Sequence, residues 1–220
     1  MKQIKTLTVI LLLLVTGVTY GQFSWGTKFG LGLSNMAMKG DAKPDYSLKT
    51  RLVYAVGLYA EYGFSENMAF QLNLSVSPKG TKYSTGDVNY KIRLSYFELQ
   101  PSVIINIPVG STTLFAAPGL YYSFLGTGML HADKAVLGVN GDEKDQTIYM
   151  GNDKEKDMMK ATDFGINLAG GIDFKEFGRL GLQYELGMAN LALITENSTS
   201  IKNSAFSIFL SYPFNKKGKK

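Results

Sequence analysis

The feature of the sequence that most constrains its fold is an alternation of apolar and polar residues with a period of two. In Phe70–Ser77 (FQLNLSVS), every second residue is apolar, and the residues between them are small or polar. Successive side chains of a β-strand point to opposite faces, so this pattern predicts a strand with one apolar face. The pattern recurs and predicts eight strands, over residues 25–33, 52–64, 70–77, 98–107, 114–124, 164–174, 180–189 and 206–214.

The predicted strands are long, and the connections between them alternate in length. Strands of roughly 9–13 residues are expected here, whereas those of soluble proteins average about 5–6 and a tilted bilayer-spanning strand needs about 9–11. Such a barrel has short turns at one end and long loops at the other. The sequence therefore predicts an all-β fold, an eight-stranded antiparallel up-and-down transmembrane β-barrel. Short connections lie at 65–67, 108–112 and 175–178, and long ones at 35–50, 79–90, 126–161 and 190–203.

The fourth strand is the least regular of the eight. Ile92, Leu94 and Tyr96 lie on the opposite parity from Leu99 and Val103. A change of parity within one strand is the expected mark of an inserted residue, so we expect a β-bulge near Tyr96–Phe97.

The apolar face of each strand can point into the barrel, as in a soluble lipocalin-like binder of apolar ligands, or outward to lipid. The polar parity is rich in glycine, including Gly26, Gly57 and Gly181. Small residues leave room for a few large polar side chains inside a narrow eight-stranded barrel. The apolar parity is also too extensive to fill one such lumen, which favours apolar side chains facing lipid.

With the apolar face outward, charged side chains enter the lumen, where buried charges need partners. A small-solute or ion channel is the alternative interpretation of the same residues. The interior of an eight-stranded barrel is mostly filled by side chains, which favours a structural network. We expect a hydrogen-bonded polar network formed by Lys28, Glu61, Arg93, Glu98, Asp173, Gln183 and Glu185.

Aromatic residues gather toward the ends of the predicted strands. Tyr54, Tyr122 and Phe164 are among those nearer the long loops. Aromatic girdles at the two membrane interfaces would produce this distribution. At the short-turn end we expect interface positions for Trp25, Tyr62, Phe64, Phe174, Tyr212 and Phe214.

The two ends of the chain differ from its body. Residues 1–21 combine Lys2 and Lys5 with a short apolar run and small residues before Gln22, which predicts a cleaved signal peptide. The barrel is then expected over 22–214. A basic tail, 215–220, follows and carries four lysines of a chain whose formal net charge is +5. The positive charge thus belongs to the ends, which argues against a nucleic-acid partner.

The sequence offers little catalytic chemistry. It has no cysteine and one histidine, His131, in the longest predicted loop. The alternating charges of Asp153–Asp157 lack the glycine and distal glutamate of a calcium loop. We therefore expect no enzyme activity, no cofactor and no metal site. The loop 126–161, which holds seven acids and five bases, is the best candidate for a protein partner's binding surface.

Several stretches together resemble a known family. The chain is similar to the PorT-like outer-membrane β-barrel proteins of Bacteroidota, which are described broadly as porin-family proteins. The resemblance implies an outer-membrane protein in contact with lipid and with the assembly machinery, which prefers a terminal aromatic such as Phe214. It implies a structural or partner-binding role, and some relatives are linked to secretion. The matching stretches are KFGLGLSN (28–35), VGLYAEYGFSENMAFQLNLSVSPKGTKY (56–83), SYFELQPSV (95–103), LFAAPGLYYSFLG (114–126) and FGRLGLQYELGMANL (177–191).

Overall fold

The computed structural model describes residues 22–43, 46–138, 141–174 and 177–215. The predicted signal peptide (1–21) and all of the predicted tail beyond Asn215 lie outside the described residues. The described part holds two short 3-10 helices, η1 (Gly40–Ala42) and η2 (Glu196–Ser198). No helix in these ranges is long and apolar enough to cross a membrane.

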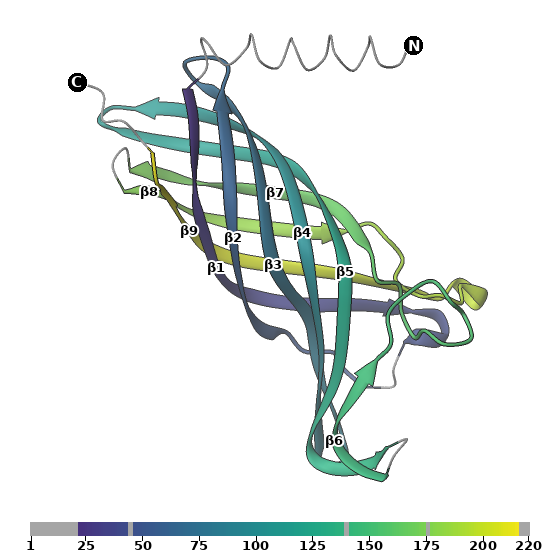
Figure 1. Cartoon of the computed structure of the whole chain (residues 1–220). Coiled ribbons are helices and arrows are strands. Elements are labelled where there is room, and N and C mark those ends of the chain that lie inside the picture. The colour runs from purple at the N-terminus through teal and green to yellow at the C-terminus, as the bar shows by residue number, and fades with distance from the viewer. Residues whose placement is uncertain (1–21, 44–45, 139–140, 175–176, 216–220) are drawn as a thin grey trace, which may run out of the picture.

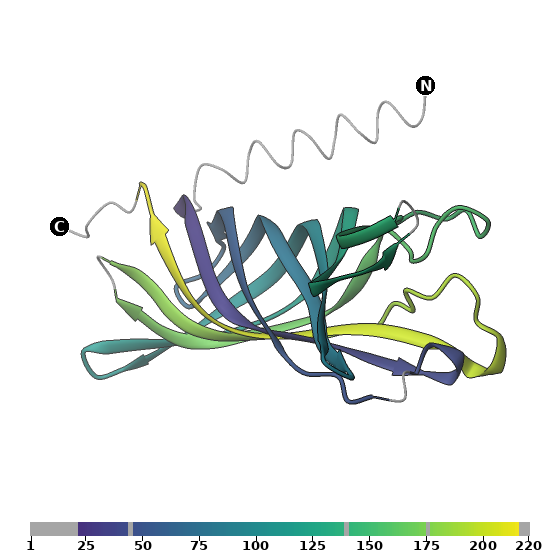
Figure 2. The ribbon, with the colours of Figure 1, turned by 90° about the horizontal axis from the view of Figure 1, so that it is seen from below.

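Within the described ranges the chain forms nine strands, and eight of them close into a ring (Figures 1 and 2). Neighbours along the ring are antiparallel, β5 pairs with both β4 and β7, and β9 closes the ring onto β1. The predicted eight-stranded antiparallel up-and-down barrel is therefore confirmed. The strands are β1 (Gln22–Lys39), β2 (Arg51–Gly63), β3 (Met68–Thr85), β4 (Val88–Val109), β5 (Thr112–Gly138), β6 (Gly141–Ile148), β7 (Asp163–Phe174), β8 (Gly178–Gly187) and β9 (Ser200–Pro213).

The long-loop end differs from the prediction, because much of it is strand rather than loop. β3 and β4 stay paired up to a turn at Gly86–Asp87, so the predicted connection 79–90 is mostly a hairpin. Gly86 has a φ of 57° in this turn, a conformation that glycine accepts easily. The predicted loop 126–161 is likewise largely strand, since β5 continues to Gly138 and pairs with the ninth strand, β6.

These continued strands form one structure, which we call the sheet extension (residues 80–94, 126–138 and 141–148). Figure 1 shows it projecting past the end of the ring, with β6 at its margin. Polar residues such as Lys82, Ser84 and Asn89 occur throughout it. On β4 the period-two alternation continues through Val88, Tyr90, Ile92 and Leu94. Leu94 is wholly buried and Ile92 packs against the same buried cluster, so the apolar parity of this part of β4 faces inward instead of toward lipid.

The bulge lies where the sequence predicts it, but on the neighbouring strand. The β4–β5 register shifts between Ser95 and Phe97, which pair with Thr127 and Phe124. The additional residue is therefore on β5, near Leu125, whose φ is 51°. β4 keeps an unbroken register with β3 through this region. It follows that β4 does not change parity, and that Leu94 and Tyr96 face inward together with Glu98.

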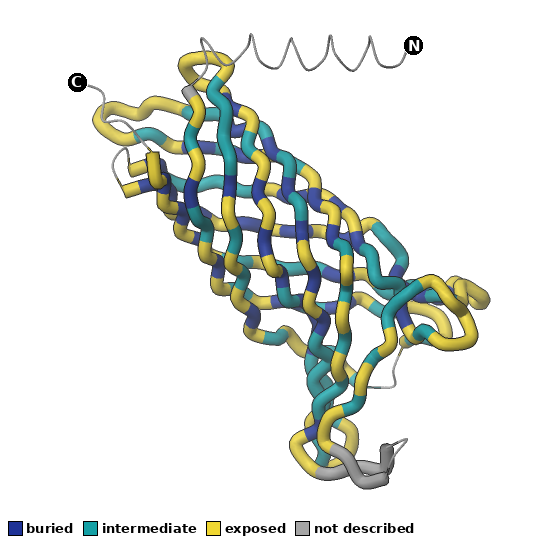
Figure 3. The backbone as a smooth tube through the Cα atoms, in the orientation of Figure 1, coloured by how far each residue is buried: buried dark blue, intermediate teal, exposed yellow. Residues whose placement is uncertain are grey.

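The apolar side chains of the ring face outward, as predicted. Leu58 is 59% exposed on β2, whereas the next residue, Tyr59, is 6% exposed and faces the lumen. Figure 3 shows this alternation of exposed and buried residues along the ring strands. An apolar-in barrel of the lipocalin kind would show the reverse pattern, so the soluble alternative does not fit the structure.

Glycines on the inward parity make room for large lumen side chains. Side chains at Gly165 or Gly187 would meet the ring or hydroxyl of Tyr121, and one at Gly181 would meet the ring of Phe209. The glycine-rich parity seen in the sequence thus allows buried aromatic and charged groups to fit in a narrow barrel.

Candidate functional site

The long-loop half of the lumen is organised around one buried cation, Lys79 of β3. Its Nζ lies 2.6 Å from Glu98 Oε2 and 3.1 Å from Glu185 Oε2, and 4.0 Å from a carboxylate oxygen of Asp163. It also lies 3.7 Å from the centroid of the Tyr121 ring. Lys79 and Glu98 are almost wholly buried, with exposures of 1% and 0%. Four strands, β3, β4, β7 and β8, thereby supply charges to one cluster, which we call the Lys79 cluster (Lys79, Glu98, Asp163 and Glu185).

Further donors, most of them neutral, surround the carboxylates of this cluster. Gln100 Nε2 donates to Glu98 at 2.7 Å and to Glu185 at 2.8 Å. Gln183 Nε2 donates to Glu185 at 2.6 Å, and Lys28 Nζ donates to Gln183 Oε1 at 2.5 Å. A carboxylate holding several hydrogen bonds tolerates burial far better than a bare one. Further donors are Ser123 to Glu98 (2.6 Å), and Asn203 (2.9 Å) and Tyr121 (3.2 Å) to Asp163.

The short-turn half of the lumen holds a second cluster, centred on Arg179 of β8. Its guanidinium makes a two-pronged contact with the carboxylate of Glu61, and its Nε donates to Asp173 Oδ2 at 3.0 Å. Gln71 Nε2 donates to the same Glu61 carboxylate at 2.9 Å. The planar guanidinium suits this paired recognition of carboxylates. We call these residues the Arg179 cluster (Glu61, Gln71, Asp173 and Arg179).

The balance of lumen charges explains the many amide donors. The described lumen side chains include five carboxylates, of Glu61, Glu98, Asp163, Asp173 and Glu185, against three cations, of Lys28, Lys79 and Arg179. These carboxylates outnumber these cations, so neutral hydrogen-bond donors add to the ion pairs. The two clusters consequently depend on glutamine, asparagine, serine and tyrosine side chains as well as on ion pairs.

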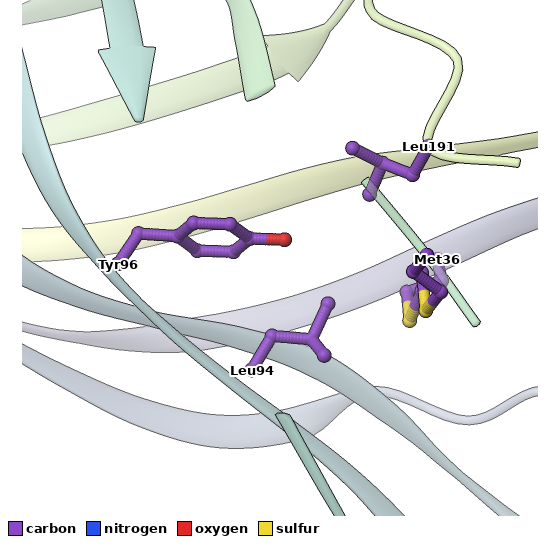
Figure 4. Packing of buried hydrophobic residues seen from close by; sticks show 5 residues of the cluster. Met36, Leu94, Tyr96 and Leu191 are labelled. Carbon is purple, nitrogen blue, oxygen red and sulfur yellow. The ribbon is translucent and has the colours of Figure 1, made fainter. Parts of the chain in front are cut away.

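An apolar cluster lies on the long-loop side of the Lys79 cluster. Leu94 and Leu191 are each 0% exposed and Tyr96 is 1% exposed. Figure 4 shows these side chains, with Met36, converging from different segments of the chain. This apolar cap (Met36, Leu94, Tyr96, Met159 and Leu191) covers the lumen at its long-loop end.

The free space within the ring is divided. One cavity, lined by Lys28, Gln100 and Gln183 among others, lies next to the Lys79 cluster. A wider one opens at the short-turn end beside Glu61 and Arg179. Between them is a narrow cavity with room for about one water molecule. Glu185 of the Lys79 cluster lines the first cavity, whereas Lys79 and Glu98 line none of the three, so none of them passes the Lys79–Glu98 ion pair.

Most of the residues expected in the polar network lie in these two clusters or between them. Lys28, Glu98, Gln183 and Glu185 meet in the long-loop half, and Glu61 and Asp173 meet in the short-turn half.

Arg93 is a correction to the expected set. Its cross-strand neighbour on β5 is Met129, which is 40% exposed and faces outward. Side chains directly opposite on antiparallel strands share a face, so Arg93 lies on the outer surface of the sheet. The expected bulge on β4 would have turned Arg93 inward, but the additional residue is on β5 and β4 keeps its parity.

Three central lumen residues, Lys79, Asp163 and Arg179, were missed by the sequence prediction. Each sits at or just beyond the end of a predicted strand, yet each continues its inward parity. Lys79 follows Asn73, Ser75 and Ser77 in steps of two. Extending every strand by one or two alternating positions would have found all three.

The aromatics expected at the short-turn end lie near that end of the ring. Trp25, Phe64, Phe174, Tyr212 and Phe214 are 44–53% exposed, and Tyr62 is partly buried. The Trp25 and Phe214 rings meet edge to face at a centroid distance of 4.8 Å. Phe214 N also donates to Trp25 O at 2.8 Å, which joins the last aromatic to the first strand.

The described residues offer no group of three or more potential metal ligands. His131 Nδ1 lies 2.7 Å from Asp145 Oδ1 across β5 and β6. The acidic segment near Asp153 forms a self-contained turn, in which the backbone N–H of Asp157 donates to Asp153 O at 2.8 Å and that of Asp153 donates to Asp157 Oδ2 at 2.8 Å.

A family model described as "Outer membrane protein beta-barrel domain" matches residues 19–193. No curated protein matches the sequence. Among solved structures, the chain is similar to the attachment invasion locus protein Ail of Yersinia pestis, with 12% identity, coverage of 88% of this chain and 99% of Ail, and a TM-score of 0.44. It is also similar to Neisserial surface protein A (10% identity, 88% and 99% coverage, TM-score 0.47) and to OprG of Pseudomonas aeruginosa (15%, 88% and 95%, TM-score 0.40).

Proposed function

The chain belongs to the outer membrane protein beta-barrel domain family, and from this membership we propose that its closed barrel anchors the sheet extension for binding a protein partner outside the cell. The barrel is an integral protein of the outer membrane. Barrels of this kind place their short turns in the periplasm and their longer connections outside. The sheet extension and the apolar cap then lie at the extracellular end.

The observation that carries this proposal is the contrast between a filled lumen and a projecting sheet. Lys79 and its carboxylate partners, together with the apolar cap, occupy the extracellular half of the lumen. A channel would need an open path at this level. The two longest strands, β4 with 22 residues and β5 with 27, instead continue past the ring into the sheet extension.

The margin of the sheet extension has a form that suits a protein partner. In the described part of the chain, β6 is paired with β5 and lies last in the strand order. A strand at the edge of a sheet presents backbone donors and acceptors to which another extended chain can pair. Lys144, Asp145 and Thr147 are exposed on it, so side chains can add specificity to such pairing.

Site-specific photocrosslinking on living cells tests the proposal. A photoreactive residue replaces Thr147 of β6 in one variant and the lipid-facing Leu182 of β8 in a control variant. We expect one discrete protein adduct from position 147 and none of the same mass from position 182. Replacing residues 126–161 by a short turn should abolish that partner's binding in a purified two-component assay while the barrel still migrates as a folded, heat-modifiable species.

Two outcomes would contradict the partner-binding role. One is the absence of any position-specific adduct along β6 in cells that display the folded barrel. The other is unchanged binding of the crosslinked partner to the variant that lacks residues 126–161. Ion conduction through the barrel would favour the channel alternative instead.

From the sequence alone we also propose a subfamily, a cleavage site and a role for the last aromatic residue. We assign the chain to the PorT-like kind on the five resembling stretches, with residues 1–21 as a cleaved signal peptide. Phe214, followed by the short basic tail, serves as the terminal aromatic for the assembly machinery. We propose no enzymatic activity and no cofactor. Amino-terminal sequencing of the purified protein checks the cleavage, which should leave Gln22 as the first residue.

A further inference from the structure

A row of cations crosses the outward face of the sheet extension. Lys49 forms an isolated antiparallel bridge with Lys82, and Lys82 is the cross-strand partner of Lys91. Directly opposite residues share a face, so these three lysines lie side by side on three neighbouring segments. Arg93 lies two residues from Lys91 on β4 and therefore on the same face. We call this set the rim patch (Lys49, Lys82, Lys91 and Arg93).

The rim patch continues the lipid-facing surface of the barrel. Along β4, the outward positions change from the apolar Leu99 and Phe97, through Ser95, to Arg93 and Lys91. Phe97 is 46% exposed and stacks near Phe124 with ring centroids 6.2 Å apart, as expected of an interfacial aromatic. A tilted strand rises about 2–3 Å per residue along the membrane normal. Arg93 is thus about 10 Å beyond Phe97, and Lys91 about 15 Å, at and just above headgroup depth.

The cations of the rim patch outnumber the carboxylates beside them. Among the described residues, no ion pair involves Lys49, Lys82, Lys91 or Arg93. A surface hollow lined by the three lysines, Asn89 and Asp133 among others provides space for an anionic group beside them. Asp133, whose carboxylate accepts hydrogen bonds from Asn89 at 2.9 and 2.6 Å, lines the same hollow, so three lysines there face one carboxylate.

The opposite face of the same hairpin is stiffened by aromatic stacking. Tyr83 and Tyr90 are cross-strand partners one position from the lysine row, and so lie on the other face. Their rings are stacked 4.8 Å apart, and Tyr46 stacks on Tyr83 at 4.3 Å. A rigid backing holds the lysines at fixed spacing, which reduces the entropy lost when they bind a ligand.

We propose that the rim patch is a binding site for the phosphate headgroup of an anionic lipid in the outer leaflet. The lipid's acyl chains would lie on the apolar face formed by Phe97 and Leu99, with its phosphate in the hollow between Lys82 and Lys91. The proposal rests on the outer-membrane location and is independent of the partner-binding role of β6. A result that contradicts the lipid site therefore does not affect the partner-binding role of β6, and the reverse also holds.

Lipid titration of the detergent-purified mature barrel, read by native mass spectrometry, tests the site. The probes are phosphatidylglycerol and, as the zwitterionic control, phosphatidylcholine. The variant Lys49→Gln/Lys82→Gln/Lys91→Gln is matched by Lys39→Gln/Lys43→Gln/Lys202→Gln, which removes three exposed lysines elsewhere on the same rim. Each lysine near an anionic surface contributes about 1 kcal/mol, so the patch variant should bind phosphatidylglycerol on the order of 100-fold more weakly.

The outcomes separate three situations. A loss confined to the patch variant, with phosphatidylcholine binding unchanged, supports the site. An equal loss in both triple variants indicates non-specific attraction and overturns it. Complete displacement of phosphatidylglycerol by excess inorganic phosphate, with no contribution of the acyl chains, assigns the hollow to a soluble anion and overturns the lipid assignment. Heat-modifiable gel migration verifies that all variants are folded.

Discussion

The two charge clusters of the lumen place the same kinds of residue in different surroundings. The Lys79 cluster lies under the apolar cap, and both Lys79 and Glu98 are essentially inaccessible. The Arg179 cluster borders the cavity at the short-turn end, and the side chains of Arg179 and Glu61 are 10% and 13% exposed. The wider cavity therefore brings water to the Arg179 cluster, whereas in the Lys79 cluster only Glu185 lines a cavity and Lys79 and Glu98 line none of the three.

This difference in water access indicates at which level the lumen is closed, and how strongly stability depends on the charges there. A buried charge whose partner is removed must be neutralised or hydrated, and the Arg179 cluster borders the wider cavity. The Lys79 cluster should therefore tolerate substitution less well than the Arg179 cluster, although both contain one central cation and at least two carboxylates.

The largest effect is expected from Lys79→Met, which leaves Glu98 and Glu185 facing each other without their cation. Loss of one partner from a buried ion pair costs about 3–5 kcal/mol. Reversible urea unfolding in lipid vesicles measures the change. Adding Glu98→Gln and Glu185→Gln to the same chain should recover most of the loss, and a destabilisation that persists in the triple variant would show that packing rather than charge is responsible.

The apolar cap should give the next largest effect. Leu94→Ala removes a wholly buried side chain and is expected to lower the free energy of unfolding by about 3 kcal/mol, since burial is lost and a cavity remains. The lipid-facing Leu182→Ala is the matched control, and vesicle unfolding again provides the measurement. Equal losses in the two variants would mean that the cap is no better packed than the lipid-facing surface.

Arg179→Met should have a smaller effect than Lys79→Met, about 2 kcal/mol, because water from the cavity at the short-turn end can hydrate Glu61 and Asp173. Arg179→Lys should recover part of this, though not all, since an ammonium cannot make the two-pronged contact. If Arg179→Met proves more damaging than Lys79→Met, the ranking of the two clusters by water access is wrong.

The smallest effect is expected at the tip of the sheet extension. Gly86→Ala puts a side chain at a φ of 57° in otherwise open space, which costs about 1 kcal/mol locally. Gly86→Asn should be milder because asparagine tolerates this conformation. Hydrogen exchange of residues 80–92 should report the change without altered protection in β7 and β8. Altered protection in β7 and β8 would show that the sheet extension is coupled to the strands that carry Asp163 and Glu185 of the Lys79 cluster.

The sequence was informative wherever lipid forced a strict alternation. Eight ring strands and their outward apolar face follow from period-two patterns such as Phe70–Ser77, because each outward residue must be apolar in the bilayer. The sheet extension was not recognised because its alternation on β4, Val88–Leu94, has the apolar residues on the inward parity, opposite to that of the lipid-facing Phe97.

The polar network was only partly predictable for a related reason. Lys28, Glu61 and Glu185 are on clear inward parities. Lys79 follows Pro78, where the alternation is interrupted. Whether the side chain of Arg93 faces inward or outward depends on which of two paired strands, β4 or β5, holds the bulge. The register between two strands is set by how they pair, so it cannot be predicted from the sequence of either strand alone.

Single-channel recording in planar lipid bilayers tests most directly whether the lumen is closed. The refolded mature barrel, verified by its heat-modifiable migration, is inserted and observed in concentrated potassium chloride. A sealed Lys79 cluster beneath the apolar cap predicts no stable conductance steps. Reproducible steps whose size changes in the Glu185→Gln variant would show that ions pass through this cluster, and would contradict the closed barrel on which the proposed anchoring role depends.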